Sequence, residues 1–254
     1  MILSGHSLSL TTLLLTVSIL LLAGIVKGTL GFGVGLVSAT LLIQLFPAKT
    51  VLVVLVLPIG LSEAGLLVNT SIPWRMMREH APFFLLLIPG AIAGVLGLLA
   101  VPVNVLYLTL SGYIVLFLAV QRYESRARQL ADQRGFGPIS GAAAGLLGGS
   151  LGGAGPAVVP YLYSNSRDYP RSVFVGGMAA ALIIPQIVRL PLFIAADRFD
   201  LQTLALGSLA AAIVLIGLSL GSWLRQYIPE DTFQLFVRGL LLLMAIQLAS
   251  DALI

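Results

Sequence analysis

The sequence predicts an all-α integral membrane protein made of two inverted repeats, each a glycine-broken helical hairpin followed by three transmembrane helices. Composition, long apolar stretches and an internal repeat support this fold class. Charged residues make up only 9% of the 254 residues, and the mean hydropathy is +1.04. In soluble domains the charged share is about 25%. The chain is therefore suited to a lipid bilayer.

Six apolar stretches are long enough to cross a bilayer as helices, which takes about 20 residues. They are residues 51–68, 82–101, 103–120, 173–195, 201–220 and 233–250. Glycines interrupt two further stretches, residues 8–46 and 137–163, so neither fits one plain helix. We expect one membrane domain with a first repeat (1–120), a cytoplasmic linker (121–136) and a second repeat (137–254).

The two glycine-broken stretches align with each other at one offset. The matched pairs are Gly24 with Gly145, Gly28 with Gly149, Thr29 with Ser150, Leu30 with Leu151 and Gly31 with Gly152. At a slightly larger offset, Gly90, Gly94, Pro102 and Gly112 match Gly217, Gly221, Pro229 and Gly239. Internal repeats with broken helices are typical of secondary transporters.

Basic residues between the stretches predict the topology, because cytoplasmic loops are enriched in lysine and arginine. The linker carries four arginines and should be cytoplasmic. If residues 137–163 form a hairpin and do not cross once, Arg167, Arg171 and Arg225 also become cytoplasmic. The second repeat is then inverted relative to the first, and both termini face outward. These arginines set topology and do not form the aromatic-interleaved patch of a nucleic-acid-binding protein.

Two four-segment halves, with a glycine-rich run at residues 145–156 that continues to Pro160, resemble the TauE/SafE family of sulfite exporters. The resemblance covers nearly the whole chain. It implies export of small sulfur-containing oxyanions, such as sulfite or organosulfonates, across a bacterial-type cytoplasmic (inner) membrane by a multi-pass protein without a nucleotide-binding domain. The first run departs from the glycine-rich form, with Phe32, Val34 and Leu36 between its glycines.

The chemistry of the breaks fits an anion independently of this resemblance. A helix that begins inside the membrane directs unpaired backbone N–H groups and a positive dipole end at the cavity, and glycine allows an oxyanion to approach closely. The predicted substrate-binding residues are Lys27, Thr29, Gly31, Gly33, Gly35, Ser150, Gly152, Gly153, Gly155, Gln186 and Arg189. Alternatively, the glycines only permit close helix packing; we favour this for Gly24 and Gly145.

Four polar residues lie in or beside apolar stretches, where a charge costs about 2.5 to 3.5 kcal/mol. Lys27 or Arg189 would compensate the anion, and Gln186 would be a neutral donor. Glu63 either carries a coupled proton or is a structural partner of Lys27 or of the backbone. Lys27 could instead lie in a cytoplasmic turn, and Arg189 could extend to the outer interface.

Other function classes find less support in the sequence. The chain has no cysteine and two histidines, His6 and His80, which form no HExxH-type metal site. Ser150 has no histidine within the apolar stretches to activate it. We therefore expect no enzyme and no cofactor. The alternatives are a non-transport membrane subunit or a transporter of a different small anion, and small-residue helix faces fit lipid or a homodimer equally.

Overall fold

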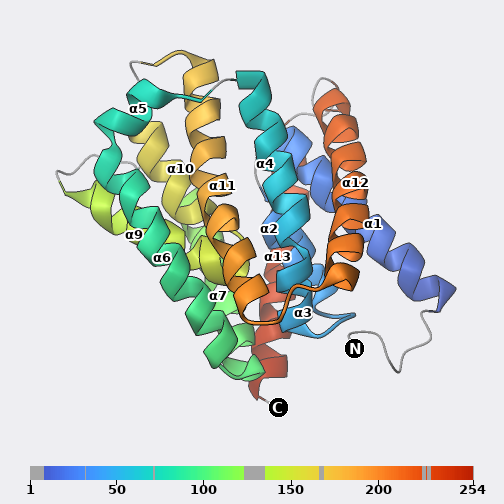
Figure 1. The fold of residues 1–254 in the computed structure, drawn as a ribbon. Helices are drawn as coiled ribbons and strands as arrows, with labels where there is room; N and C mark the ends of the chain where they lie inside the picture. Colours follow the sequence, from blue (N-terminus) through green and yellow to red (C-terminus); the bar gives the residue numbers. More distant parts are fainter. Residues whose placement is uncertain are drawn as a thin grey trace.

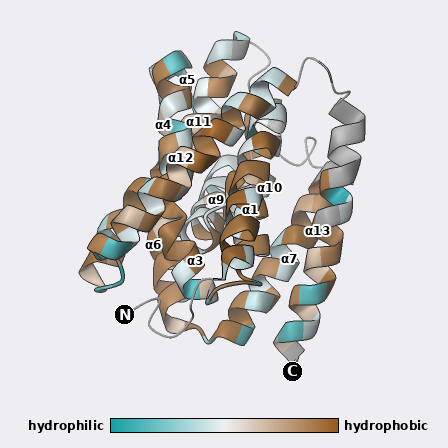
Figure 2. Cartoon of the chain, turned by 90° about the vertical axis from the view of Figure 1, so that its right-hand side faces the viewer, coloured by the Kyte–Doolittle hydropathy of each residue, from teal (hydrophilic) through white to brown (hydrophobic). Residues whose placement is uncertain are grey.

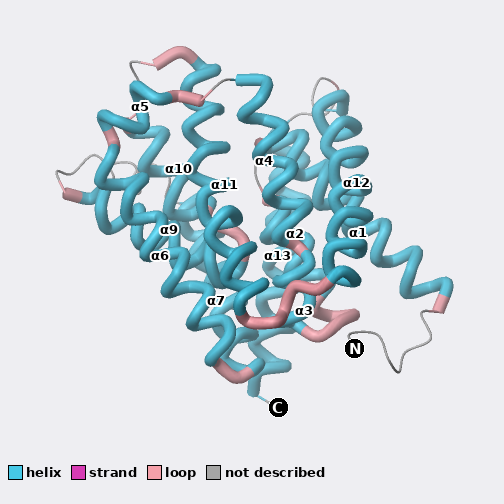
Figure 3. The backbone as a smooth tube through the Cα atoms, viewed as in Figure 1, coloured by secondary structure: helices cyan, strands magenta, loops and turns pink. Residues whose placement is uncertain are grey.

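A computed structural model describes residues 9–31, 33–70, 72–122, 135–165, 169–224, 227 and 230–253. Its regular structure in these residues is entirely helical (Figure 3). The first half contains α1 (Leu10–Leu30), α2 (Val34–Leu42), α3 (Ala48–Val54), α4 (Val56–Thr70), α5 (Trp74–Glu79), α6 (Ala81–Ala100) and α7 (Val103–Arg122). The second contains α9 (Phe136–Leu151), α10 (Gly155–Ser164), α11 (Arg171–Ala195), α12 (Leu201–Leu224) and α13 (Glu230–Leu253).

Among the described residues, six helical stretches are long and apolar enough to cross a membrane. Five coincide with predicted spans, and the sixth is Leu10–Thr29 in the first broken stretch. The remaining predicted span, residues 233–250, lies within α13. Hydrophobic residues predominate along most of the helices (Figure 2). The protein is therefore a multi-pass, all-helical membrane protein, as the sequence predicts.

Each half packs its first helix against the other half. Helix α1 lies along α12, and the equivalent α9 lies along α6. Glycines permit both contacts: a Cβ on Gly24 would clash with the carbonyl oxygen of Val214, and one on Gly145 with that of Leu87. The packing interpretation of these two glycines is correct, because any side chain would force the helices apart.

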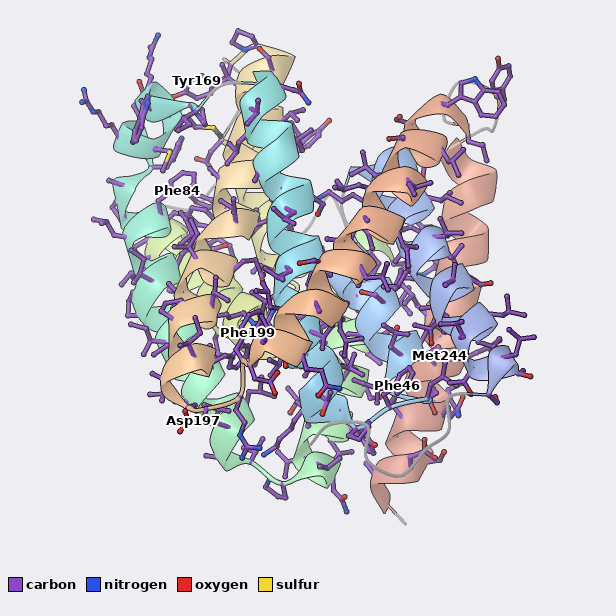
Figure 4. All side chains as sticks on the ribbon, turned by 45° about the vertical axis from the view of Figure 1, so that its right-hand side comes forward. Phe46, Phe84, Tyr169, Asp197, Phe199 and Met244 are labelled. Atoms are coloured by element: carbon purple, nitrogen blue, oxygen red, sulfur yellow. The ribbon has the colours of Figure 1, made fainter. Side chains whose placement is uncertain are left out.

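The equivalent helices α4 and α11 pack against each other in the centre of the molecule (Figure 1). In that view α4 rises from α3, whereas α11 descends from its yellow to its orange end. Tyr169, just before α11, and Asp197, just after it, lie at opposite ends of the molecule (Figure 4). An inverted repeat requires such antiparallel equivalents; the orientation of the halves in the membrane stays a prediction.

Part of the topology prediction concerns residues 123–134 of the predicted linker, Arg167 and Arg225, which lie outside the described residues, as does Pro229 of the repeat alignment. At the Tyr169 end, Arg75 and Glu79 form an exposed ion pair at 2.9 Å, and the Tyr169 hydroxyl donates to Glu79. These two contacts lower the pKa of Glu79 below its ordinary value. They connect α5 of the first half to the segment preceding α11.

Candidate functional site

Both glycine-broken stretches interrupt their helices at left-handed glycines. Gly31, at φ 85°, caps the end of α1, and Gly33, at φ 107°, precedes α2. Gly152, at φ 74°, caps the end of α9. These backbone angles favour glycine, because a Cβ meets the carbonyl oxygen in the left-handed region. Both helices therefore break at the repeated glycines, as the sequence predicts.

The two breaks touch each other in space. A Cβ added to Gly35 would clash with the carbonyl oxygen of Gly152, so the start of α2 lies directly against the end of α9. Between them is a cavity of about 30 Å³. It is lined by Gly33, Val34, Gly35, Leu36, Ile59, Glu63, Tyr113, Phe117, Gly152, Gly153, Ala154, Gly155 and Leu182. Five predicted binding glycines and Glu63 therefore come together.

The helices α2 and α10 both begin at this cavity. The first N–H groups of a helix have no partner within it and carry the positive end of its dipole. The N-cap residue of neither helix makes a side-chain hydrogen bond to the first turn. At α10 the Gly155 amide interacts with the Tyr113 hydroxyl. Pro156 has no N–H, and the Ala157 N–H donates to the Ala154 carbonyl oxygen at 3.1 Å. The backbone donors at the cavity therefore come mainly from α2, and α10 adds the positive end of its dipole. Such an arrangement stabilises negative charge without a fixed cationic side chain.

Lys27 and Glu63 form a buried ion pair beside the cavity. Their exposed fractions are 3% and 4%, and Lys27 Nζ contacts Glu63 Oε1. Lys27 Nζ also donates to Ser62 Oγ at 2.9 Å. Of the two roles expected for Glu63, the structure shows the partner of Lys27. The positive charge of Lys27 is consequently already compensated, and Lys27 does not lie in a turn.

Arg189 is fully buried, so it does not extend to the outer interface as one alternative supposed. Its Nη1 donates to Gln186 Oε1 at 2.9 Å, and its Nη2 donates to the carbonyl oxygen of Leu52 at 2.6 Å. That carbonyl is in the last turn of α3, where the helical hydrogen-bond ladder is interrupted before α4. A Cβ on Gly152 would lie 2.6 Å from Arg189 Nη1. The guanidinium is thus directly behind the second glycine turn.

Six predicted binding residues do not line the cavity: Lys27, Gln186 and Arg189, described above, and Thr29, Gly31 and Ser150. The Thr29 hydroxyl donates to the carbonyl oxygens of Ile25 and Val26, both at 2.9 Å. The Ser150 hydroxyl donates to the carbonyl oxygen of Leu146 at 2.7 Å. Gly31 faces open space, with no neighbouring atom within 4 Å of an added Cβ. In this conformation both hydroxyl hydrogens are used inside their own helices.

Tyr113 in α7 is a cavity residue that the sequence reasoning missed. Its side chain is buried, and the Gly155 backbone amide interacts with its hydroxyl oxygen. A Cβ on Gly153 would lie 2.6 Å from Tyr113 Oη, so this phenol closes the cavity opposite the second glycine turn. A tyrosine within the apolar stretch 103–120 was the available signal, because a buried phenol usually needs a polar partner.

The fold and the paired breaks define a multi-pass helical transporter. Residues 16–248 match the family model described as sulfite exporter TauE/SafE. The protein belongs to this family of membrane transporters, which are not enzymes. The family implies a small anion as substrate. Comparisons with curated proteins and with solved structures gave no match.

Proposed function

We propose that the protein exports small sulfur-containing oxyanions, sulfite or an organosulfonate, from the cytoplasm by alternating access across a bacterial-type inner membrane. One observation carries this proposal. A helix N-terminus and a glycine turn from each half converge on one buried cavity. Sulfite and sulfonates present three oxygens on one sulfur, which suits several convergent N–H donors.

The glycines explain how an oxyanion could reach the backbone donors. At Gly153 a side chain would occupy the space in front of the Tyr113 hydroxyl, and at Gly35 it would meet the opposite break. Backbone donors are held in place by the fold before the anion binds. The site therefore selects a desolvated anion by its size and shape. The role of Thr29, Ser150 and Gly31 in binding stays a prediction.

Reciprocal packing of the halves supports alternating access. Because α1 packs on α12 and α9 on α6, each half holds one broken hairpin of the other. Rigid-body rocking of such a pair around a fixed central site would open the site to each side in turn.

The inverted topology can be tested in the cysteine-free chain. We predict that Asn165→Cys is labelled by an impermeant maleimide only from the cytoplasmic side. Labelling from the outside would contradict the inverted arrangement.

Efflux of radiolabelled sulfite from proteoliposomes tests the proposed function. We expect wild-type protein to release sulfite and Gly153→Val to release at least tenfold less, because its side chain would fill the cavity beside Tyr113. Gly97→Val is the matched control, because an added Cβ there meets no atom within 4 Å. Absence of efflux from wild type, or equal efflux from the Gly153 variant, would contradict the proposal.

Membrane potential can drive this export. A potential that is negative inside favours anion exit by about 2.3 kcal/mol per elementary charge per 100 mV. We infer that no proton is coupled, since Glu63 is engaged by Lys27. Efflux should then continue when the pH gradient is abolished at constant membrane potential. Efflux that stopped under these conditions would show that a proton is coupled.

A further inference from the structure

Glu63 presents one carboxylate oxygen that the ion pair does not use. Its Oε1 contacts Lys27, whereas Oε2 is buried and has no hydrogen-bond partner among the described residues. Glu63 itself lines the cavity. A buried carboxylate oxygen without a donor is costly, and a donor on a bound ligand would relieve that cost. The cavity thus combines the N–H donors of α2 and the positive dipole end of α10 with one acceptor.

The buried charges near the cavity add up to one positive charge. Lys27, Glu63 and Arg189 are the buried ionisable side chains with formal charge in the described part of the chain. Two are cations and one is an anion. A singly charged anion would neutralise this set, whereas a dianion would add uncompensated negative charge next to Glu63 in a low-dielectric site.

We propose that the cavity selects a monoanion that carries a hydrogen-bond donor, with Glu63 as the residue that sets this specificity. The anionic oxygens would accept from the N–H groups that open α2, beside the positive dipole end of α10. The donor of the ligand, an O–H or N–H, would bond Glu63 Oε2. Hydrogensulfite, in its O–H form, and hydroxyl-substituted sulfonates have this chemistry, whereas the sulfite dianion and sulfate do not. The inference rests on the cavity being the anion site of the proposed function.

Two probe anions of the same shape isolate the contribution of the ligand's hydrogen-bond donor. Sulfamate and methanesulfonate have the same size and the same single negative charge, but sulfamate carries N–H donors where methanesulfonate carries a methyl group. Sulfate adds a second charge. Titration of each sodium salt into purified protein at constant ionic strength, followed by thermal unfolding, gives the affinities through linkage. We expect sulfamate to bind about tenfold more tightly than methanesulfonate, equivalent to ~1.4 kcal/mol, and sulfate to bind more weakly than both.

Variants test whether Glu63 is responsible for the preference for sulfamate over methanesulfonate. In Glu63→Gln the preference for sulfamate should fall below threefold, and sulfate should gain affinity. Because this change leaves Lys27 unpaired, the double variant Lys27→Met/Glu63→Gln provides the same test without a lone buried cation. Glu79→Gln is the control: it removes the same charge from an exposed carboxylate outside the cavity, and we expect it to keep the wild-type preference.

The outcomes separate this inference from the proposed function. Equal binding of sulfamate and methanesulfonate by wild type, or tighter binding of sulfate, would overturn the specificity proposal and leave the anion site standing. A preference retained in both Glu63 variants would overturn the role of Glu63. Stabilisation by none of the three anions would overturn this inference together with the proposed site, even if sulfite efflux from proteoliposomes were observed.

Discussion

The two breaks have the same backbone design but different polar partners. Each joins a helix ended by a left-handed glycine to a second, shorter helix that begins at the shared cavity. At the first break the cation Lys27 pairs with a carboxylate from another helix. At the second break the cation Arg189 is held by the side-chain oxygen of Gln186 and the backbone carbonyl of Leu52.

This difference separates the binding of the anion's oxygen atoms from the selection of its charge. The repeated glycine turns bring the N-termini of α2 and α10 to one cavity, so both halves can contribute to the anion-binding surface. The side chains differ, and their sum leaves one positive charge among the buried residues described. Glu63 and Gln186, which match in the repeat alignment once a two-residue gap is allowed, show the same division, because one carries a charge and the other is neutral. The backbone of the breaks would bind oxygen atoms, and the differing side chains would set the charge of the ligand.

The largest effect on stability is expected from breaking the Lys27–Glu63 ion pair at the first break. Lys27→Met leaves Glu63 buried and unpaired, which typically costs about 3 to 5 kcal/mol in the free energy of unfolding. The double variant Lys27→Met/Glu63→Gln should recover most of this loss. Thermal unfolding in detergent measures both. A double variant as unstable as the single variant would show that the pair does not act as a unit.

The corresponding change at the second break should cost less. Arg189→Met removes the donors to Leu52 and Gln186 but leaves no buried carboxylate behind, and unsatisfied neutral acceptors cost about 1 to 3 kcal/mol. The same unfolding measurement compares it with Lys27→Met. Greater destabilisation by Arg189→Met would mean that the second break, and not the first, depends most on its cation.

The glycine turns also differ in what surrounds them. Gly31→Ala and Gly152→Ala each place a Cβ in the left-handed region, at about 1 to 2 kcal/mol. Only at Gly152 would that Cβ also meet Arg189 Nη1 at 2.6 Å and Ile59 Cδ1 at 2.9 Å. We therefore expect Gly152→Ala to lower the unfolding temperature more than Gly31→Ala. Equal shifts would indicate that the Arg189 side chain moves away without cost.

The smallest effects are expected at the matched hydroxyls. Thr29 and Ser150 donate to carbonyl oxygens of their own helices, and such local bonds contribute little to stability. Thr29→Ala and Ser150→Ala should each change the free energy of unfolding by under about 1 kcal/mol. Sulfite affinity, measured by the same thermal shift, should change by less than tenfold. A larger loss in either variant would show that its hydroxyl turns toward the anion in the loaded state.

The sequence predicts the backbone of this protein better than its side-chain contacts. Apolar length locates the membrane helices, and repeated glycines locate both breaks, because helix formation and its interruption depend on nearby residues. The pairing of Lys27 with Glu63 joins residues 36 positions apart on separate helices, so the sequence left two roles open for Glu63. Tyr113 was missed for the same reason: its place opposite Gly153 depends on how α7 packs.

Sulfite binding to two variants tests whether one anion site is shared by both breaks. In Gly35→Ala an added Cβ meets the carbonyl oxygen of Gly152, and in Gly153→Val the side chain meets the Tyr113 hydroxyl. Thermal-shift titration with sulfite, on protein whose unfolding remains cooperative, gives the affinity of each. We predict that either variant alone lowers sulfite affinity at least tenfold. Wild-type affinity in one of them would place the site at a single break and contradict the shared cavity.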